Sequence, residues 1–249
     1  MILHETINIT WLGGAGFLLA YKDKQIALDL YLSDFLAQEN GDFKRLTPSP
    51  LQVQDLKSLD YLICSHDHGD HFDQGSMAKL LEIAPDLKVF GPSSVLKLAH
   101  QLHMDGNRFV RLDRGEALNL GEIKLQAFVA NHGALAPDAI GILLQMANKR
   151  IFFAGDSSFC EAYLDYTNGQ KGFDLLLVAI NGRYGNPNPK EAARIAQILE
   201  AKLTIPCHFW LLKEHGGDPY AFAKACAIQI PPVNYKMLAI GEAYALPTS

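Results

Sequence analysis

Short apolar segments alternate with helical segments along the chain, and this pattern limits the possible folds more than any other feature. The segments at 7–11, 16–21 and 25–29 are rich in β-branched and aromatic residues, and the last two are separated only by a polar turn. We expect them to form a β-meander. Further strands are expected at 61–64, 89–91, 109–111, 123–128, 141–146, 151–154 and 175–180. The last of these is entirely apolar, so it is expected to be buried on both faces.

Helical spacing or capping signals predict four helices, at 76–84, 94–103, 189–199 and 220–227. Asn188 with Glu191 has the pattern of a capping box around Pro189, and Asp218 precedes Pro219 in the same way. Several strands adjoin through short turns, which excludes a purely parallel doubly wound sheet. The pattern therefore predicts one α+β domain over 1–249, with two mixed sheets flanked by helices and one long irregular segment at 32–50.

The composition favours a globular enzyme that acts on a small molecule. The chain is 49% hydrophobic, which suffices for a sizeable core, and its net charge of -5 without a Lys/Arg cluster argues against a nucleic-acid partner. The start MILHETINITWL resembles neither a signal peptide nor a membrane anchor, so we expect a cytoplasmic protein with no membrane partner. The sequence leaves open whether the chain forms a homo-oligomer. The four cysteines form no C-x-x-C pair and are expected to be buried thiols: Cys64, Cys160, Cys207 and Cys226.

The strongest chemical signal is the segment His66-Asp67-His68-Gly69-Asp70-His71, which follows the strand at 61–64 and precedes the helix at 76–84. Three imidazoles and a carboxylate within six positions of a loop can turn toward one point. Surface histidines are the ordinary alternative, but with nine His in the chain this spacing rarely arises by chance. The segment therefore predicts a metal site.

This segment resembles the H-x-H-x-D-H signature of the metallo-β-lactamase superfamily. The resemblance implies a four-layer αββα sandwich and a two-metal site, completed by a lone His, an Asp in a Gly-Asp context and a last His after a strand. Here these are His132, Asp156 and His208. Each lies just past a predicted strand end, where loops held by a sheet present catalytic groups.

The family pattern divides these residues between two ions. One ion would be held by His66, His68 and His132, the other by Asp70, His71 and His208, with Asp156 bridging them. The same pattern implies that Asp70, His132 and Asp156 are catalytic. Two divalent ions, zinc or manganese with iron as a further option, would share a hydroxide that attacks an ester, lactone or phosphoester.

Four other segments are similar to the L-ascorbate-6-phosphate lactonase group: 11–17, 28–33, 181–183 and 205–208. This resemblance implies a small anionic substrate, such as a sugar-acid phosphate lactone. Arg183 is then expected to bind the phosphate or carboxylate, with a structural salt bridge as the alternative. The segment 184–189 is expected to border the substrate.

Three more positions carry hypotheses. Asp29, at the end of a predicted strand, is expected to accept a hydrogen bond from a ligand imidazole, with a turn or cap as the alternative. His215, on a glycine-bearing loop seven residues after His208, is a substrate-binding candidate or a surface residue. His4, His100 and His103 match no ligand position, and the last two are expected to be solvated.

Two other functions remain as alternatives. Related superfamily members use the same ligand set on phosphoesters, so a phosphodiesterase or phospholipase-D-like hydrolase is one. An iron-binding redox protein is the other, although diiron carriers with this fold typically have a carboxylate at the position of His68 and an attached flavin domain. A binding module without activity would be expected to have lost ligands, whereas all seven positions are filled.

Overall fold

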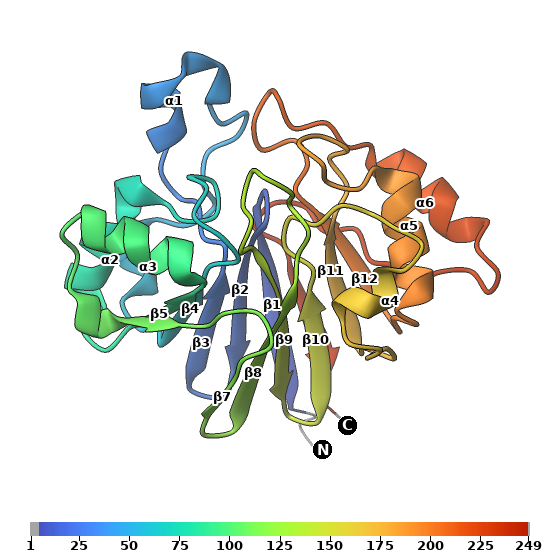
Figure 1. The fold of residues 1–249 in the computed structure, drawn as a ribbon, viewed down its shortest axis with the longest axis horizontal. Helices are drawn as coiled ribbons and strands as arrows, with labels where there is room; N and C mark the ends of the chain where they lie inside the picture. The colour runs from blue at the N-terminus through green and yellow to red at the C-terminus, as the bar shows by residue number, and fades with distance from the viewer. Residues whose placement is uncertain (1–4, 249) are drawn as a thin grey trace.

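The computed structural model describes residues 5–248, so His4 lies outside the described residues. Two β-sheets pack face to face, with helices on both outer faces, as the sequence predicts (Figure 1). The first sheet has the order β13 (Ala243–Pro247), β1 (Thr6–Gly13), β2 (Gly16–Tyr21), β3 (Lys24–Leu28), β4 (Tyr61–Ile63), β5 (Lys88–Gly91), β6 (Phe109–Arg111). It is antiparallel from β13 to β3 and parallel from β3 to β6, and therefore mixed.

The second sheet is also mixed. Its order is β12 (Thr204–Cys207), β11 (Leu175–Ala179), β10 (Lys149–Phe153), β9 (Ile140–Met146), β8 (Ile123–Val129), β7 (Ala117–Leu120). β10, β11 and β12 are parallel, whereas β7, β8, β9 and β10 pair antiparallel in succession. β11 is buried at every position, as its apolar sequence predicts.

The helices lie in two groups beside the sheets (Figure 1). The α-helices are α1 (Phe35–Glu39), α2 (Gln74–Ile83), α3 (Ser93–Gln101), α4 (Tyr163–Tyr166), α5 (Pro189–Ile198) and α6 (Pro219–Ala227), and the 3₁₀ helices are η1 (Gly41–Phe43), η2 (Val53–Leu56) and η3 (Gly106–Arg108). The predicted capping box of α5 is confirmed, because the Asn188 side chain accepts from the backbone N–H groups of Lys190 and Glu191 while the Glu191 carboxylate accepts from Asn188 N–H. No helix in residues 5–248 is both long and apolar enough to cross a membrane.

Several details differ from the sequence analysis, which did not predict the short helix α4. The strands β7 and β13 were not predicted; β7 alternates between exposed and half-buried residues, and β13 buries only one. The segment 32–50 contains α1 and η1 rather than being wholly irregular. Cys160 is half-buried, whereas the other three thiols are buried as expected.

The space between the two sheets holds the larger apolar core, in which Phe17 of β2 meets Phe153 of β10 with ring centroids 6.4 Å apart. A second core lies between the first sheet and α2 and α3, where Leu62 and Val89 are grouped with Met77 and Val95. Both sheets are thereby held rigidly in place. This rigidity matters because the loops that follow their strands carry the polar cluster described below.

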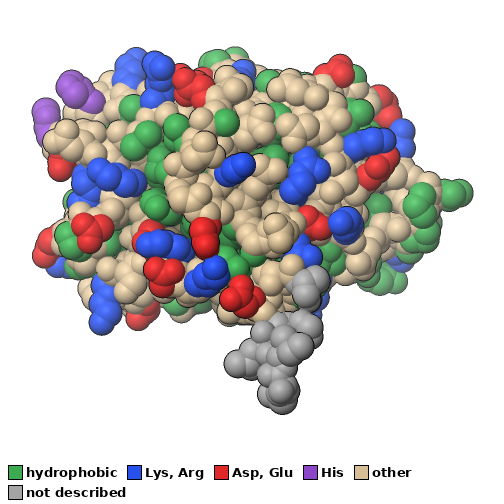
Figure 2. All heavy atoms as spheres, turned by 90° about the horizontal axis from the view of Figure 1, so that it is seen from below, with side chains coloured by type: hydrophobic (Ala, Val, Ile, Leu, Met, Phe, Trp, Pro, Cys, Tyr) green, Lys and Arg blue, Asp and Glu red, His purple; other side chains and the backbone are tan. Residues whose placement is uncertain are grey.

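The strand directions bring several carboxyl ends to one edge of the sandwich. β3 and β4 are parallel neighbours, and β8, β10, β11 and β12 run in one direction within their sheet. The loops after these strands lie at the top of Figure 1, and the start of β1 and the end of β13 lie at the opposite edge. Figure 2 views that opposite edge, where Lys/Arg and Asp/Glu side chains are interspersed without a patch of one sign.

The aromatic packing around Phe152 gives a test of the core. Phe152 is 1% exposed, stacks on Phe173 with centroids 4.9 Å apart and meets Phe128 edge to face. Phe152→Ala should lower the free energy of unfolding by about 3–5 kcal/mol, because it removes the ring and leaves a cavity. Ile228→Ala, at a site 74% exposed, should change it by less than about 0.5 kcal/mol. Urea denaturation measures both, and equal effects would contradict this description of the core.

Candidate metal centre

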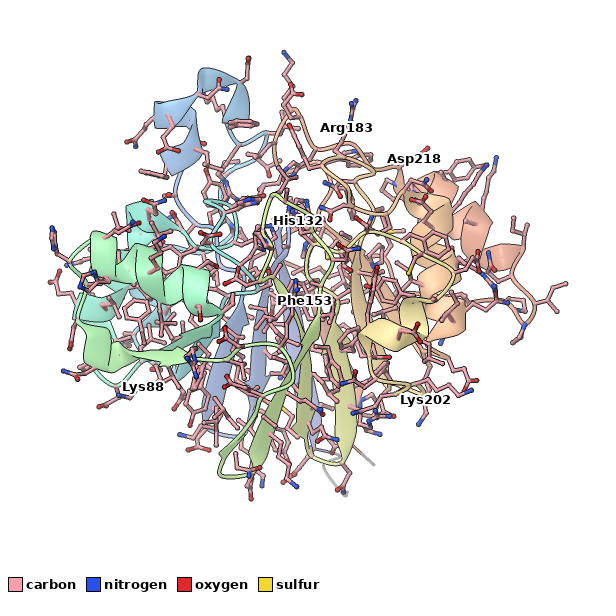
Figure 3. All side chains as sticks on the ribbon, viewed as in Figure 1. Lys88, His132, Phe153, Arg183, Lys202 and Asp218 are labelled. Carbon is pink, nitrogen blue, oxygen red and sulfur yellow. The ribbon has the colours of Figure 1, made fainter. Side chains whose placement is uncertain are left out.

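The residues that sequence analysis selected as ligands lie together at the carboxyl edge of the two sheets. The 66–71 loop follows β4, while His132, Asp156 and His208 come within three residues of the ends of β8, β10 and β12. The ring centroids of His66 and His132 are 5.2 Å apart, and those of His71 and His208 are 5.1 Å apart. His132 is labelled in Figure 3 at the top of the sandwich. Residues more than 100 positions apart are thus neighbours.

A buried carboxylate, Asp29, connects the end of β3 to this loop. It accepts hydrogen bonds from Ser65 N (2.6 Å), Ser65 Oγ (2.5 Å) and His71 Nδ1 (2.5 Å), and its side chain is fully buried. Because Nδ1 of His71 donates to the carboxylate, Nε2 faces the cluster, and in the neutral imidazole it carries the lone pair that can bind a metal ion. The expected contact between Asp29 and a ligand imidazole is therefore present, and Asp29 holds the ring without pointing into the centre itself.

Hydrogen bonds also select the free nitrogen of two other imidazoles. The Ser65 hydroxyl donates to Asp29, so it accepts from His66 Nδ1 at 3.0 Å and leaves His66 Nε2 free. His66 Nε2 is buried and has no partner. His68 instead uses Nε2, which donates to the Leu135 carbonyl at 3.1 Å, so its Nδ1 is free. His66, His68 and His132 offer three nitrogens within 4.8 Å of one another.

A second set of donors lies beside the first. His71 Nε2 and His208 Nε2 are 3.1 Å apart, and both face Asp70 Oδ2, at 3.7 Å and 3.5 Å. They also face Asp156 Oδ1, at 3.6 Å and 3.3 Å. Asp156 Oδ2, in turn, lies 3.7 Å from His132 Nε2 of the first set. Asp156 therefore presents one oxygen to each set.

The spacing of these donors fits a metal ion better than hydrogen bonding. Distances of 3.3–3.7 Å between imidazole nitrogens and carboxylate oxygens exceed the usual 2.7–3.2 Å of a hydrogen bond. Two donors that each lie about 2.1 Å from a tetrahedral ion are separated by about 3.4 Å. Asp156 Oδ1 is buried without a partner, as is His66 Nε2. The donor set and its unpartnered atoms thus suit divalent metal ions.

Charge states also suit a metal ion. Burial lowers the pKa of His66 well below its usual range and lowers that of His208 to about 4, which keeps both imidazoles neutral. Burial opposes ionisation of Asp156, but the imidazoles of His208 and His71 outweigh it and hold the pKa well below its usual range. Neutral imidazoles and ionised carboxylates are the forms that bind divalent ions.

His71 is the exception among the imidazoles. Burial lowers its pKa, but Asp70, Asp156 and Asp29 outweigh burial and raise it well above the usual range. These carboxylates favour a positive charge between them, whether a proton or a metal ion provides it. The environment of His71 therefore marks the position where a cation is most strongly favoured.

Local backbone features place Asp156. Gly155 has φ +61°, and a Cβ there would lie 2.9 Å from the Ile140 carbonyl, so only glycine fits this turn after β10. The Asn186 side chain donates to Asp156 Oδ2 at 2.7 Å. Asn186 lies in the 184–189 segment, and its amide fixes the orientation of the carboxylate between the two donor sets.

A cavity of about 280 Å³ opens above the donors. Its floor is formed by His68, Asp70, His132, Asp156, His208 and His215, and its wall by Leu36, Phe43, Leu135, Tyr184 and Leu212 together with Gly69. The wall is largely apolar. Among the described residues, no Lys or Arg lines it.

The remaining sequence-derived candidates lie in different places. His215 is buried and lines the cavity, whereas Arg183 is exposed and does not (Figure 3). His100 and His103 are exposed.

Sequence reasoning missed Ser65, Asn186 and the Leu135 carbonyl, which orient ligands by hydrogen bonds. Only Ser65 carried a signal, its position between the strand and the first histidine.

Comparisons with known proteins find a family model and several relatives that match this chain. Residues 26–209 match the family model described as a beta-lactamase superfamily domain. A UPF0173 protein of Pyrococcus furiosus is 29% identical over 192 residues, which cover 76% of this chain and 85% of the relative. A solved structure of a metallo hydrolase from Ignicoccus hospitalis superimposes with a TM-score of 0.78 at 17% identity, covering 97% of this chain and 98% of that one.

Another relative is named for phospholipase D activity. N-acyl-phosphatidylethanolamine-hydrolyzing phospholipase D 1 of Caenorhabditis elegans is 26% identical over 223 residues. The match covers 80% of this chain but 63% of that enzyme's length. The chain thus spans less than two thirds of this relative.

The hydrogen bond between Asp29 and His71 can be tested without a substrate. Asp29→Asn should weaken zinc binding by about 10- to 100-fold, because the amide holds the His71 ring less firmly and no longer supports its basicity. Competition with a chromophoric chelator measures the affinity. Asp218→Asn, at the exposed cap of α6, should leave it unchanged. Unaltered zinc affinity in folded Asp29→Asn would show that the carboxylate does not support the metal centre.

Proposed function

The chain belongs to the beta-lactamase superfamily, and we propose that it is a metal-dependent hydrolase acting on a small ester or lactone with an apolar group. Its two mixed sheets with outer helices are the metallo-β-lactamase fold, as predicted. The observation that carries the proposal is the convergence of imidazoles and carboxylates at the floor of an open cavity. Such a floor is typical of a hydrolytic metal centre.

We assign the donors to two positions. His66, His68 and His132 would hold one ion, and Asp70, His71 and His208 the other, while Asp156 presents one oxygen to each set. Zinc, manganese and iron all accept these ligands. When bound, such ions polarise a scissile carbonyl or phosphoryl group and lower the pKa of water toward neutrality.

The residues around the donors orient the donor side chains through hydrogen bonds. Asp29 and Ser65 hold His71 and His66 in single tautomers, and Asn186 fixes the carboxylate of Asp156. Preorganised groups of this kind need no rearrangement when charge develops on the substrate. Asp70 and His132 line the cavity beside Asp156, so all three are placed to act on the reacting bond.

The wall of the cavity indicates the substrate class. Leu36, Phe43, Leu135 and Leu212 are apolar, and Tyr184 adds an aromatic ring. A phosphate or carboxylate that is remote from the donors would be desolvated there without a cationic partner. A lactone or ester with an apolar ring or acyl group therefore fits better than a sugar-acid phosphate lactone, unless its charge lies against the ions.

A phosphodiester with an apolar substituent is the second candidate. The relative in Caenorhabditis elegans is named for phospholipase D activity on an N-acylated phospholipid. In this chain, the same apolar wall could accept an acyl chain while the phosphoryl group lies at the donors. A parallel screen of lactones, carboxylic esters and phosphodiesters with matched apolar groups decides between the candidates.

The first functional prediction concerns Asp156. Asp156→Ala should abolish hydrolysis and lower the metal content, because both donor sets lose an oxygen. His103→Ala, in the exposed turn that follows α3, should change neither. Elemental analysis and a hydrolysis assay on both variants provide the measurement. Full activity in folded Asp156→Ala would overturn the assignment of the centre.

The second functional prediction concerns the wall. Phe43→Ala should raise KM about tenfold for a hexanoyl ester while affecting the matching acetyl ester less, because burial of a longer acyl chain is lost. Leu46→Ala is the control, because Leu46 is 56% exposed and lies outside the cavity wall.

Arg183→Ala tests the alternative of an anionic substrate. A selective KM increase for a phosphorylated lactone in Arg183→Ala, with Phe43→Ala neutral, would favour an anionic substrate instead.

A further inference from the structure

We propose that His215 is a direct metal donor at the position formed by Asp70, His71 and His208, an inference that rests on the metal-dependent function proposed above. The seven residues of the superfamily pattern do not include it. The structure nevertheless places its imidazole on the cavity floor, against Asp70 and His208. This position would then have more protein donors than the one formed by His66, His68 and His132.

The distances around His215 match those of the other donors. His215 Nε2 lies 3.5 Å from Asp70 Oδ2, the same distance as between His208 Nε2 and that oxygen. The ligand atoms of Asp70, His208 and His215 all lie within 4.8 Å of one another. A separation of 3.5 Å is longer than the usual hydrogen bond and corresponds to two donors around one ion. The two imidazoles therefore flank Asp70 in equivalent ways.

Burial gives an independent reason. The His215 side chain is 4% exposed, and its Nδ1 is buried without a hydrogen-bond partner. An imidazole in this setting loses its hydration without full compensation from the protein. Binding of Nε2 to a cation beside Asp70 would offset part of this desolvation, while Nδ1 would stay without a partner. A histidine kept on this loop for surface solvation would not be enclosed in this way.

The loop that carries His215 is held tightly. His215 N–H donates to the Leu212 carbonyl, and the Trp210 indole donates to the Gly217 carbonyl. A Cβ at Gly216 would lie 2.5 Å from the Asn181 carbonyl, so the loop packs directly against the second residue after β11. The backbone thus fixes where His215 can reach, which is what a metal donor requires.

The test measures metal binding rather than turnover. His215→Gln keeps a side chain that can donate a hydrogen bond to Asp70, but a neutral amide is a poor donor to zinc or cobalt. His215→Cys replaces the imidazole with a thiolate, which is a good donor to both. His100→Gln, at an exposed position of α3, is the matched control. Thermal unfolding verifies that every variant is folded.

Wild type and His100→Gln should bind two equivalents of zinc or Co²⁺. His215→Gln should bind the second equivalent about 100-fold or more weakly, because a direct ligand contributes at least as much as the groups that orient ligands. Cobalt-loaded His215→Cys should retain two equivalents and gain a thiolate-to-metal charge-transfer band. This band shows whether a side chain at 215 can reach the ion, and the affinity of His215→Gln shows whether the native imidazole binds it.

The outcomes separate this inference from the proposed function. If wild type binds no metal under any loading condition, the metal-dependent function itself fails. If wild type binds two equivalents and folded His215→Gln binds both as tightly, His215 is not a donor, whether or not His215→Cys shows a charge-transfer band. The proposed hydrolase would remain intact in that case.

Discussion

The metal centre depends on one buried carboxylate. Asp29 lies at the end of β3 with φ +42° and a fully buried side chain, and three hydrogen bonds from Ser65 and His71 compensate for its burial. Removing either partner would leave a desolvated charge, so the three residues are stable only together. Because His71 reaches across to His208 on the other sheet, this interaction sets how the donors of both sheets meet.

Electrostatics explains why these groups do not simply neutralise one another. His71 Nε2 and His208 Nε2 face each other at 3.1 Å, and burial holds the pKa of His208 at about 4. Two neutral lone pairs in this position repel unless a proton or a metal ion lies between them. Protonation of His71 resolves the conflict in one way, but it leaves His66 Nε2 and Asp156 Oδ1 buried without partners. Divalent ions satisfy all of these atoms, so metal binding should also stabilise the fold.

The sequence predicts the two mixed sheets with outer helices because they follow from local patterns, whereas His132, Asp156 and His208 were selected only through the superfamily resemblance. Apolar runs and caps define most strands and α5, and the 66–71 spacing directs attention to one loop. The edge strands β7 and β13 are not predicted from the sequence because few of their residues are buried, so their sequences lack a strong apolar period. The orienting roles of Asn186 and the Leu135 carbonyl are not predicted from the sequence for a different reason. They orient Asp156 and His68 only through tertiary contacts, and the carbonyl is independent of residue type. The position of His215 likewise depends on how its loop packs on Asn181.

Metal chemistry and substrate choice are built from different parts of this molecule. The donors follow directly after strands, so any chain that keeps the sheets and the spacing can keep the centre. The wall comes from loops and from α1 and η1, through Leu36, Phe43 and Tyr184, where length and sequence can change without disturbing a strand. Arg183 illustrates the point, since it lies in a segment that resembles the lactonase group yet is exposed outside the cavity wall. Resemblance therefore carries the reaction class to this chain more securely than the substrate, which the apolar wall limits independently.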